Sequence, residues 1–323
     1  MRLGIVGCGL IGQKRAAAAR GHQVALVADL DPGRAQALAD TTGASVAKDW
    51  QALVTAALDA VIIATTHNSL APIATAALDA GKHVLVEKPA GMNMAEVARL
   101  AEASAKAGRV CKVGFNHRFH PAIWKAKELV DQGAVGSIMF LRGRYGHGGR
   151  LGMELEWRAQ PEQSGGGELI DQGSHLIDLS RWFLGELDLA FAATPTLFWD
   201  MKVDDNCFLA LKNDAGQIAW LHASWSEWKN MFSLEIYGRD GKLMIDGLGG
   251  SYGPEKLTWF KMLPQMGPPQ TTVFDFPGAD LSWDAEFADF ADAIAKGRRA
   301  TGDIEDALAM HKIIAAAYQG AQP

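Results

Sequence analysis

The stretch that decides the fold of this chain runs Leu3-Gly4-Ile5-Val6-Gly7-Cys8-Gly9-Leu10-Ile11-Gly12. It opens with an apolar strand, Leu3 to Val6, and its glycines precede a predicted helix through Ala16 to Arg20. A second strand, Gln23 to Ala28, ends at Asp29. Glycines in this arrangement allow a tight turn and a close approach of a pyrophosphate to the helix N-terminus. Strand, glycines, helix, strand and acid in this order predict a dinucleotide-binding unit.

Asp29 indicates which dinucleotide this unit binds. A carboxylate about 20 residues after the glycines accepts hydrogen bonds from the adenosine ribose and repels a 2′-phosphate. The next residue is Leu30 rather than a basic residue, so NAD is favoured over NADP. We predict cofactor contacts from the fingerprint and from the ends of later strands: Gly7, Gly9, Leu10, Ile11, Gly12, Asp29, Thr65, Glu87 and Lys88.

Strands and helices continue to alternate up to residue 113. The predicted elements are a strand, a helix, a strand, a helix and a strand: Ala60 to Thr65, Pro72 to Ala80, His83 to Glu87, Met94 to Ala107 and Val110 to Val113. Apolar strands that alternate with helices predict a parallel sheet covered on both faces, with ligands at the carboxyl ends of its strands. Lys88 follows such an end, and Pro89 keeps its backbone extended.

The chain then becomes rich in strands with short links, which predicts antiparallel pairing. After a helix at Ile123 to Val130, the predicted strands are Ile138 to Tyr145, Leu187 to Ala192, Asn206 to Leu211, Ile218 to Ser226, Phe232 to Gly238 and Lys242 to Ile245. Leu263 to Gln270 reads as a loop, and the closing helices are Trp283 to Ala295 and Ile304 to Tyr318. Alternation puts Trp220 and His222 on one sheet face and Trp225 on the other.

The fold class is therefore α/β, with an N-terminal Rossmann domain over residues 1–118. A C-terminal α+β domain with a large, mostly antiparallel sheet is predicted over residues 119–323. Whether the last helix, 303–320, packs back on the first domain is left open.

Composition excludes several classes of protein. With 323 residues, 48% hydrophobic and 21% charged, the chain is long enough for two well-packed domains. A net charge of −6 disfavours a nucleic-acid partner, and no apolar run reaches the roughly 18 residues that span a membrane. Cys8, Cys111 and Cys207 form neither a disulfide framework nor a metal pattern, which favours the reducing cytoplasm.

A second stretch carries the chemistry: Gly165-Gly166-Gly167-Glu168-Leu169-Ile170-Asp171-Gln172-Gly173-Ser174-His175-Leu176-Ile177-Asp178. If a helix follows the glycines, Asp171, His175 and Asp178 share one face. The glycines allow something to approach the backbone closely, and a helix N-terminus favours anions. An imidazole is suited to accept a hydroxyl proton near neutral pH, and Asp171 is placed to orient it. Asp178 reads as a supporting partner of His175 or of nearby backbone.

These motifs resemble the Gfo/Idh/MocA oxidoreductases. The resemblance rests on the fingerprint, Glu87-Lys88-Pro89, Trp157-Arg158 before Ser164-Gly165-Gly166-Gly167, and Asp171 to Asp178. It implies a nicotinamide-dependent enzyme for a sugar or cyclitol, with Lys88, Asp171 and His175 as the catalytic group and a sheet face that forms dimers or tetramers. Thr66 and Ala71 stand where the family pattern has proline and histidine, which points to a substrate of its own.

The expected function is thus NAD(H)-dependent oxidation of a secondary hydroxyl, or the reverse, on a sugar, cyclitol or nucleotide-activated sugar. Expected substrate contacts are Lys88, Asn116, Arg158, Asp171 and His175, with no metal. Two alternatives stay open: a dinucleotide sensor without catalysis, and a metal site for hydrolysis formed by Asp171, His175 and Asp178. Six other histidines have no comparable partner at helical spacing, and most of them are expected to be surface or satisfied core residues: His22, His67, His83, His117, His120 and His147.

Overall fold

The structure is a computed structural model that describes residues 1–320, and these fall into two compact units. The first contains Met1–Phe115, Glu162–Gly165 and Trp283–His311. The second contains Asn116–Pro161, Gly166–Ser282 and the chain from Lys312. Each unit is thus assembled from separated parts of the chain. The division at residue 118, drawn from sequence, stays a prediction.

The first unit is built on a six-stranded sheet in the order β3-β2-β1-β4-β5-β6, and every pairing in it is parallel. Its strands are β1 (Arg2–Val6), β2 (Gln23–Ala28), β3 (Ser45–Val46), β4 (Ala60–Ile63), β5 (His83–Val86) and β6 (Cys111–Val113). The reversal of strand order beside β1 and β4 is where open parallel sheets bind ligands. The predicted Rossmann sheet is confirmed.

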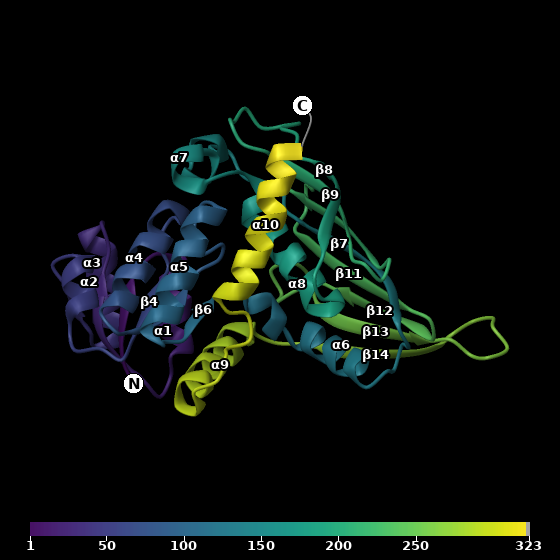
Figure 1. Cartoon of the computed structure of the whole chain (residues 1–323), viewed down its shortest axis with the longest axis horizontal. Coiled ribbons are helices and arrows are strands. Elements are labelled where there is room, and N and C mark those ends of the chain that lie inside the picture. Colours follow the sequence, from purple (N-terminus) through teal and green to yellow (C-terminus); the bar gives the residue numbers. More distant parts are fainter. Residues whose placement is uncertain (321–323) are drawn as a thin grey trace. The chain divides into compact units, whose positions relative to one another are not determined.

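Helices surround this sheet (Figure 1): α1 (Leu10–Ala18), α2 (Pro32–Thr42), α3 (Trp50–Thr55), α4 (His67–Asp79) and α5 (Met94–Ala107). From near the end of the chain, α9 (Ser282–Lys296) adds Phe287 and Phe290 to the core formed by Leu3 and Ile5. The final helix is α10 (Ile304–Gly320).

The helix predicted to begin at Pro72 begins at His67, so Pro72 lies inside α4. A proline there removes one backbone hydrogen bond. The same helix buries Leu70 and Ile73 completely or nearly so, and this packing outweighs the loss.

The second unit contains an eight-stranded sheet in the order β14-β13-β12-β11-β7-β10-β9-β8. Its strands are β7 (Ile138–Gly146), β8 (Asp188–Ala193), β9 (Asn206–Lys212), β10 (Ile218–Ser224), β11 (Met231–Gly238), β12 (Gly241–Asp246), β13 (Glu255–Lys261) and β14 (Gln270–Phe276). All pairings are antiparallel except that of β10 with β7. The mostly antiparallel sheet is confirmed, although β13 and β14 were not predicted.

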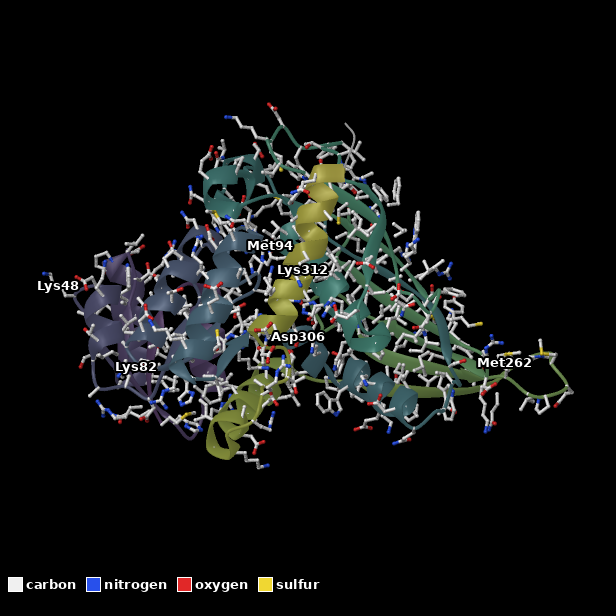
Figure 2. All side chains as sticks on the ribbon, viewed as in Figure 1. Lys48, Lys82, Met94, Met262, Asp306 and Lys312 are labelled. Atoms are coloured by element: carbon white, nitrogen blue, oxygen red, sulfur yellow. The ribbon has the colours of Figure 1, made fainter. Side chains whose placement is uncertain are left out.

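The two faces of this sheet differ. Helices α6 (Pro121–Asp131) and α8 (Ser174–Leu184) pack on one face, which buries Leu209, Leu221 and Leu234 completely or nearly so. The opposite face leaves Trp220 48% exposed and His222 half-buried, whereas Trp225 is fully buried, as alternation predicted. Met262, labelled in Figure 2, lies where β13 gives way to the loop before β14.

Short helical turns connect the rest of the second unit: η1 (Asn116–Phe119), η2 (Met153–Leu155), η3 (Trp157–Ala159) and η4 (Leu169–Gly173). Between η3 and η4 in the chain lies α7 (Pro161–Ser164), which belongs to the first unit from Glu162 onward. The turn η4 is a π-helix that runs directly into α8. The helix predicted after the three glycines is therefore α-helical only from Ser174. Within residues 1–320 no helix is long and apolar enough to cross a membrane.

Candidate functional site

The glycine turn of the first unit is shaped by its neighbours. Gly7 has a φ of +92°, and a Cβ on it would lie 2.4 Å from the carbonyl oxygen of Ala64. A Cβ on Gly12 would lie 1.9 Å from the carbonyl oxygen of Gly7. Any side chain at either position would therefore push the turn away from β4 or from α1.

Gly9 occupies a different environment. A Cβ on it would meet nothing within 4 Å, so open space adjoins the start of α1. Because Gly9 is the N-cap residue and has no side chain, it does not occupy the first N–H groups of that helix. Leu10 and Ile11 begin the helix, and Leu10 is 69% exposed. Open space before uncapped backbone N–H groups fits the pyrophosphate of a dinucleotide.

Asp29 lies beside this turn at the end of β2. Its Oδ2 accepts a hydrogen bond from the N–H of Cys8 at 2.6 Å, and its Oδ1 accepts one from the N–H of Asp31 at 2.8 Å. The carboxylate is half-buried, so it is both fixed and within reach of solvent. A fixed acceptor at this position fits the ribose hydroxyls that the sequence predicts it to bind.

Lys88 belongs to a turn that the first unit holds on both sides. Glu87 accepts from Nε of the fully buried Arg15 at 2.6 Å. On the other side, the carbonyl oxygen of Pro89 accepts from Nε2 of His311 at 2.9 Å. Burial lowers the pKa of His311 to about 4, so the imidazole is a neutral donor. Lys88 itself is half-buried between these two anchors.

Thr65 and Glu87 are the remaining predicted cofactor residues. Thr65 is half-buried directly after β4, and its Oγ1 donates to the carbonyl oxygen of Thr66 at 3.2 Å. The Glu87 carboxylate is engaged by Arg15, which gives this side chain a structural partner inside the protein. Contact of either residue with a cofactor stays a prediction.

The three glycines before η4 allow a close approach to their backbone, as the sequence predicts, and the groups that approach belong to the protein itself. A Cβ on Gly166 would lie 2.2 Å from the hydroxyl of Tyr318, and one on Gly167 would lie 1.9 Å from the carbonyl oxygen of Asp204. The Asp204 carboxylate also accepts from the N–H groups of Gly167 and Leu169 at 3.0 and 2.7 Å. The anion at this helix start is therefore Asp204, whose pKa is raised by its burial.

Asp171 is 7% exposed and lies in the π-helical turn. Its Oδ2 accepts from Nε of Arg158 at 3.1 Å, and the guanidinium of Arg158 lies over the ring of Trp157 at 4.5 Å. The structure thus brings together two of the predicted substrate residues. Their pairing supplies a carboxylate and a cation side by side, which suits a hydroxyl that both donates and accepts.

His175 is 4% exposed and stacks on a second imidazole, that of His117. The ring centroids are 3.7 Å apart and the ring planes differ by 23°. Asn116, predicted to bind substrate, approaches Nδ1 of His117 with its Oδ1 at 3.2 Å. The sequence grouped His117 with histidines most of which are expected to be surface or satisfied core residues, and it did not predict the stacking on His175. The position of His117 directly after β6, at the start of η1, was the available signal.

Asp178 has a partner that the sequence did not suggest. Its carboxylate accepts from Nε and Nη2 of Arg118 at 2.8 and 2.6 Å in a buried, bidentate pair. Since Asp171 and Asp178 each face an arginine, the arrangement does not favour a cation between them. The interpretation of Asp178 as a partner of His175 or of nearby backbone stays a prediction beside this ion pair with Arg118.

Two tyrosines and a histidine complete the surroundings. Tyr145 lies 5.1 Å from His117 and 4.8 Å from Tyr252, measured between ring centroids. Burial, with the neighbouring Tyr252 and Asp171, holds the pKa of Tyr145 well above its usual value. Burial lowers the pKa of His147, which also feels the charge of Asp171. Tyr252 was not selected from sequence.

Comparison with known proteins follows the same division of the chain. Residues 1–115 match the oxidoreductase family with the NAD-binding Rossmann fold, and residues 123–244 match the GFO/IDH/MocA C-terminal domain. Inositol 2-dehydrogenase 2 of Saccharopolyspora erythraea is 34% identical over 226 residues, which are 67% of this chain and 64% of that relative. D-xylose 1-dehydrogenase (NADP(+)) 2 of Haloferax volcanii is 29% identical over an alignment of 334 residues, which covers 100% of this chain and 98% of that relative.

A solved structure shares the fold throughout. Levoglucosan dehydrogenase in complex with NADH and levoglucosan superimposes with a TM-score of 0.88 at 24% identity, over 99% of this chain and 97% of that one. The family matches cover both the cofactor unit and most of the sheet of the second unit. The chain therefore belongs to the Gfo/Idh/MocA oxidoreductases, with an NAD-binding Rossmann unit and the C-terminal domain of that family.

Proposed function

We propose that the protein is an NAD-dependent dehydrogenase that interconverts a secondary hydroxyl and a ketone on a sugar, a cyclitol or a nucleotide-activated sugar. One observation carries the proposal: a buried imidazole, His175, follows the ion-paired Asp171 by one helical turn, in a chain that also has a dinucleotide cradle. The inositol and xylose dehydrogenases to which the chain is similar support the substrate class.

The residues divide the proposed reaction between them. A bound nicotinamide would supply the acceptor for the hydride that leaves the alcohol carbon. His175 accepts the hydroxyl proton, because imidazole changes its charge near neutral pH. Asp171, fixed by Arg158, stabilises the imidazolium that results. Lys88 donates a hydrogen bond to the reacting oxygen, and Asn116 and Arg158 orient the remaining hydroxyls.

The test is turnover of the purified protein. We expect a change in nicotinamide absorbance with at least one compound from a panel of inositols, aldoses, anhydrosugars and nucleotide sugars, each with NAD and with NADP. Calorimetry of NAD binding runs in parallel. Binding without turnover on the entire panel would overturn the proposal in favour of a dinucleotide sensor.

Cofactor preference depends on Asp29 in this proposal. In Asp29→Asn the loss of a charged acceptor is expected to lower kcat/KM for NAD relative to that for NADP by about 10- to 100-fold. Asp31→Asn is the matched control, because Asp31 is exposed and caps α2 through the N–H groups of Gly33 and Arg34. An unchanged ratio of the two kcat/KM values in Asp29→Asn would contradict this role.

We also propose that the protein forms a homodimer or homotetramer through the open face of its eight-stranded sheet. Aromatic rings cover this face in stacked pairs, Trp220 with Phe191 at 6.3 Å and His222 with Phe208 at 4.2 Å between centroids. Exposed aromatic surface of this kind is typical of an interface core. Its antiparallel order also suits a twofold contact between identical faces.

Trp220→Glu tests this interface. A charge at the centre of the aromatic face is expected to shift the mass measured by light scattering toward the monomer. The control is Trp228→Glu, on the turn between β10 and β11, where the tryptophan is 67% exposed. If both variants keep the wild-type mass, the sheet face is not the interface.

For the compartment we propose the cytoplasm. Cys8, Cys111 and Cys207 are all buried thiols, and burial raises the pKa of Cys8 to about 12. Unreactive thiols without disulfides suit a reducing environment.

A further inference from the structure

The stacked imidazoles of His175 and His117 are the feature that the proposed reaction leaves unexplained. They come from different elements, α8 and η1, and are 4% and 6% exposed. At 3.7 Å between centroids they are in van der Waals contact face to face. The base proposed for the reaction therefore lies against a second ring of the same chemical type.

His117 is oriented independently of His175. Its Nδ1 lies 3.2 Å from Oδ1 of Asn116, and because an amide oxygen only accepts, that nitrogen carries a hydrogen. The amide nitrogen of Asn116 donates to Oγ of Ser282 at 3.0 Å, and that hydroxyl donates to Asp280 at 2.6 Å. A chain of hydrogen bonds that ends on a carboxylate thus fixes the plane of the His117 ring, against which His175 rests.

The stack also couples the charges of the two rings. Two imidazolium ions at this separation repel strongly away from bulk water, so such a pair binds its protons in two distinct macroscopic steps. Titratable or charged groups of the second unit near the pair include Tyr145, Tyr252, Glu168, His120 with Glu255, Asp171, and the Arg118–Asp178 pair. None of these is altered by a substitution confined to His117.

We propose that His117 is a positioning residue for His175. By stacking, it fixes the ring plane of the base. By competing for the first proton, it also extends to lower pH the range in which His175 is neutral and able to accept a proton. The inference rests on the proposed function, from which it takes the transfer of the hydride and the proton. In that step the alcohol C–H leaves as hydride to the nicotinamide, the O–H proton passes to His175, and a carbonyl remains.

The first test needs no substrate. Histidine side chains labelled with ¹⁵N are titrated by NMR in the wild-type protein and in His117→Phe, which keeps a flat ring but removes its proton site. We expect His175 to titrate in one step and at higher pH in His117→Phe, and over a broader range in two steps in the wild type. The same midpoint and shape in both proteins would overturn the coupling.

The second test separates ring support from charge. The acid limb of the kcat/KM profile is expected to move to higher pH in His117→Phe, as the NMR titration does. His117→Ala, which removes the ring, is expected to lower kcat at every pH by about 10-fold or more while the Kd for NAD is unchanged. Equal kcat values in the Phe and Ala variants would overturn the positioning role.

The variant His175→Asn distinguishes a failure of the inference about His117 from a failure of the proposed function. If it is inactive and His117→Phe leaves the pH profile unchanged, the inference about His117 fails and the proposed function stands. If His175→Asn keeps full turnover, the proposed base is wrong, and only the NMR titration then bears on the coupling. Should His117→Ala fail to fold, the Phe variant still decides the coupling by titration and profile.

Discussion

Replacing His175 with asparagine is expected to lower kcat/KM by about 10²- to 10⁴-fold, because asparagine can hydrogen-bond a hydroxyl but cannot take its proton. The Kd for NAD, measured by calorimetry, should stay at the wild-type value, since the predicted cofactor contacts belong to the first unit. His22→Asn is the control, as this half-buried histidine lies near the N-terminal amine of Met1. Similar activity in the two variants would remove His175 from the reaction.

Lys88→Met extends this prediction to the first unit. We expect a comparable loss in kcat/KM, because methionine keeps the length of the side chain but donates no hydrogen bond. Lys82→Met is the control: Lys82 precedes β5, whereas Lys88 follows it, and Lys82 is labelled in Figure 2. If Lys88 and His175 act on one hydroxyl, the double variant loses less than the product of the two single losses. Strictly multiplicative losses would indicate separate roles.

The sequence predicted best where local pattern and topology agree. The bounds of β2 and α5 match the prediction residue for residue. A short apolar strand after a glycine, and a periodic helix between cap residues, each leave few alternatives for where the element begins and ends. Strands β13 and β14 were missed because their pattern is weaker. Lys256, Thr258 and Phe260 alternate with Leu257 and Trp259 without a clear change in polarity, and β14 is an edge strand with four of its seven residues exposed.

The π-helical turn could not be predicted either. Its residues, Leu169 to Gly173, have the same apolar pattern as the α-helix they precede. What makes the turn possible is tertiary: Asp204, more than 30 positions away in the chain, accepts from the N–H of Leu169. Periodicity carries no information about such a partner, and π-turns often accompany functional sites.

The sequence predicted residues of the candidate site, and the structure adds the contacts that hold them. Sequence reasoning selected Asp171 and His175 together from their helical spacing, and Arg158 separately from its motif. That Arg158 holds Asp171, and that His117 lies against His175, depends on elements far apart in the chain meeting in the second unit. Contacts of this kind are set by the packing of the sheet and its helices, which no local window contains.

Arg15→Met is expected to lower the free energy of unfolding by about 3–5 kcal/mol, the cost of removing one partner from a buried ion pair. Arg15 is fully buried and engages two carboxylates, Glu87 after β5 and Glu286 of α9. Methionine keeps most of the volume but leaves both carboxylates without their cation. Chemical denaturation measures the change, and Arg20→Met, at the exposed end of α1, should stay within about 0.5 kcal/mol.

The loss in Arg15→Met should depend on pH in a definite direction. Burial raises the pKa of Glu286 above its value in the unfolded chain, and Arg15 opposes that rise. A carboxyl with a raised folded pKa binds its proton more tightly when folded, so its contribution to stability falls as pH rises from about 4.5 through the folded pKa. Without Arg15 the pKa of Glu286 in the folded protein rises further, so the pH range over which this carboxyl lowers the stability becomes wider.

Unfolding curves of the wild type and Arg15→Met at pH 5 and pH 8 test this sign. We expect the difference in unfolding free energy to be larger at pH 8, where Glu286 must be either charged without its cation or held neutral at a cost. In Arg15→Met combined with Glu286→Gln, the glutamine cannot ionise, so most of the pH dependence should disappear. A difference that is constant with pH, or larger at pH 5, would mean that packing rather than charge makes Arg15 important to the fold.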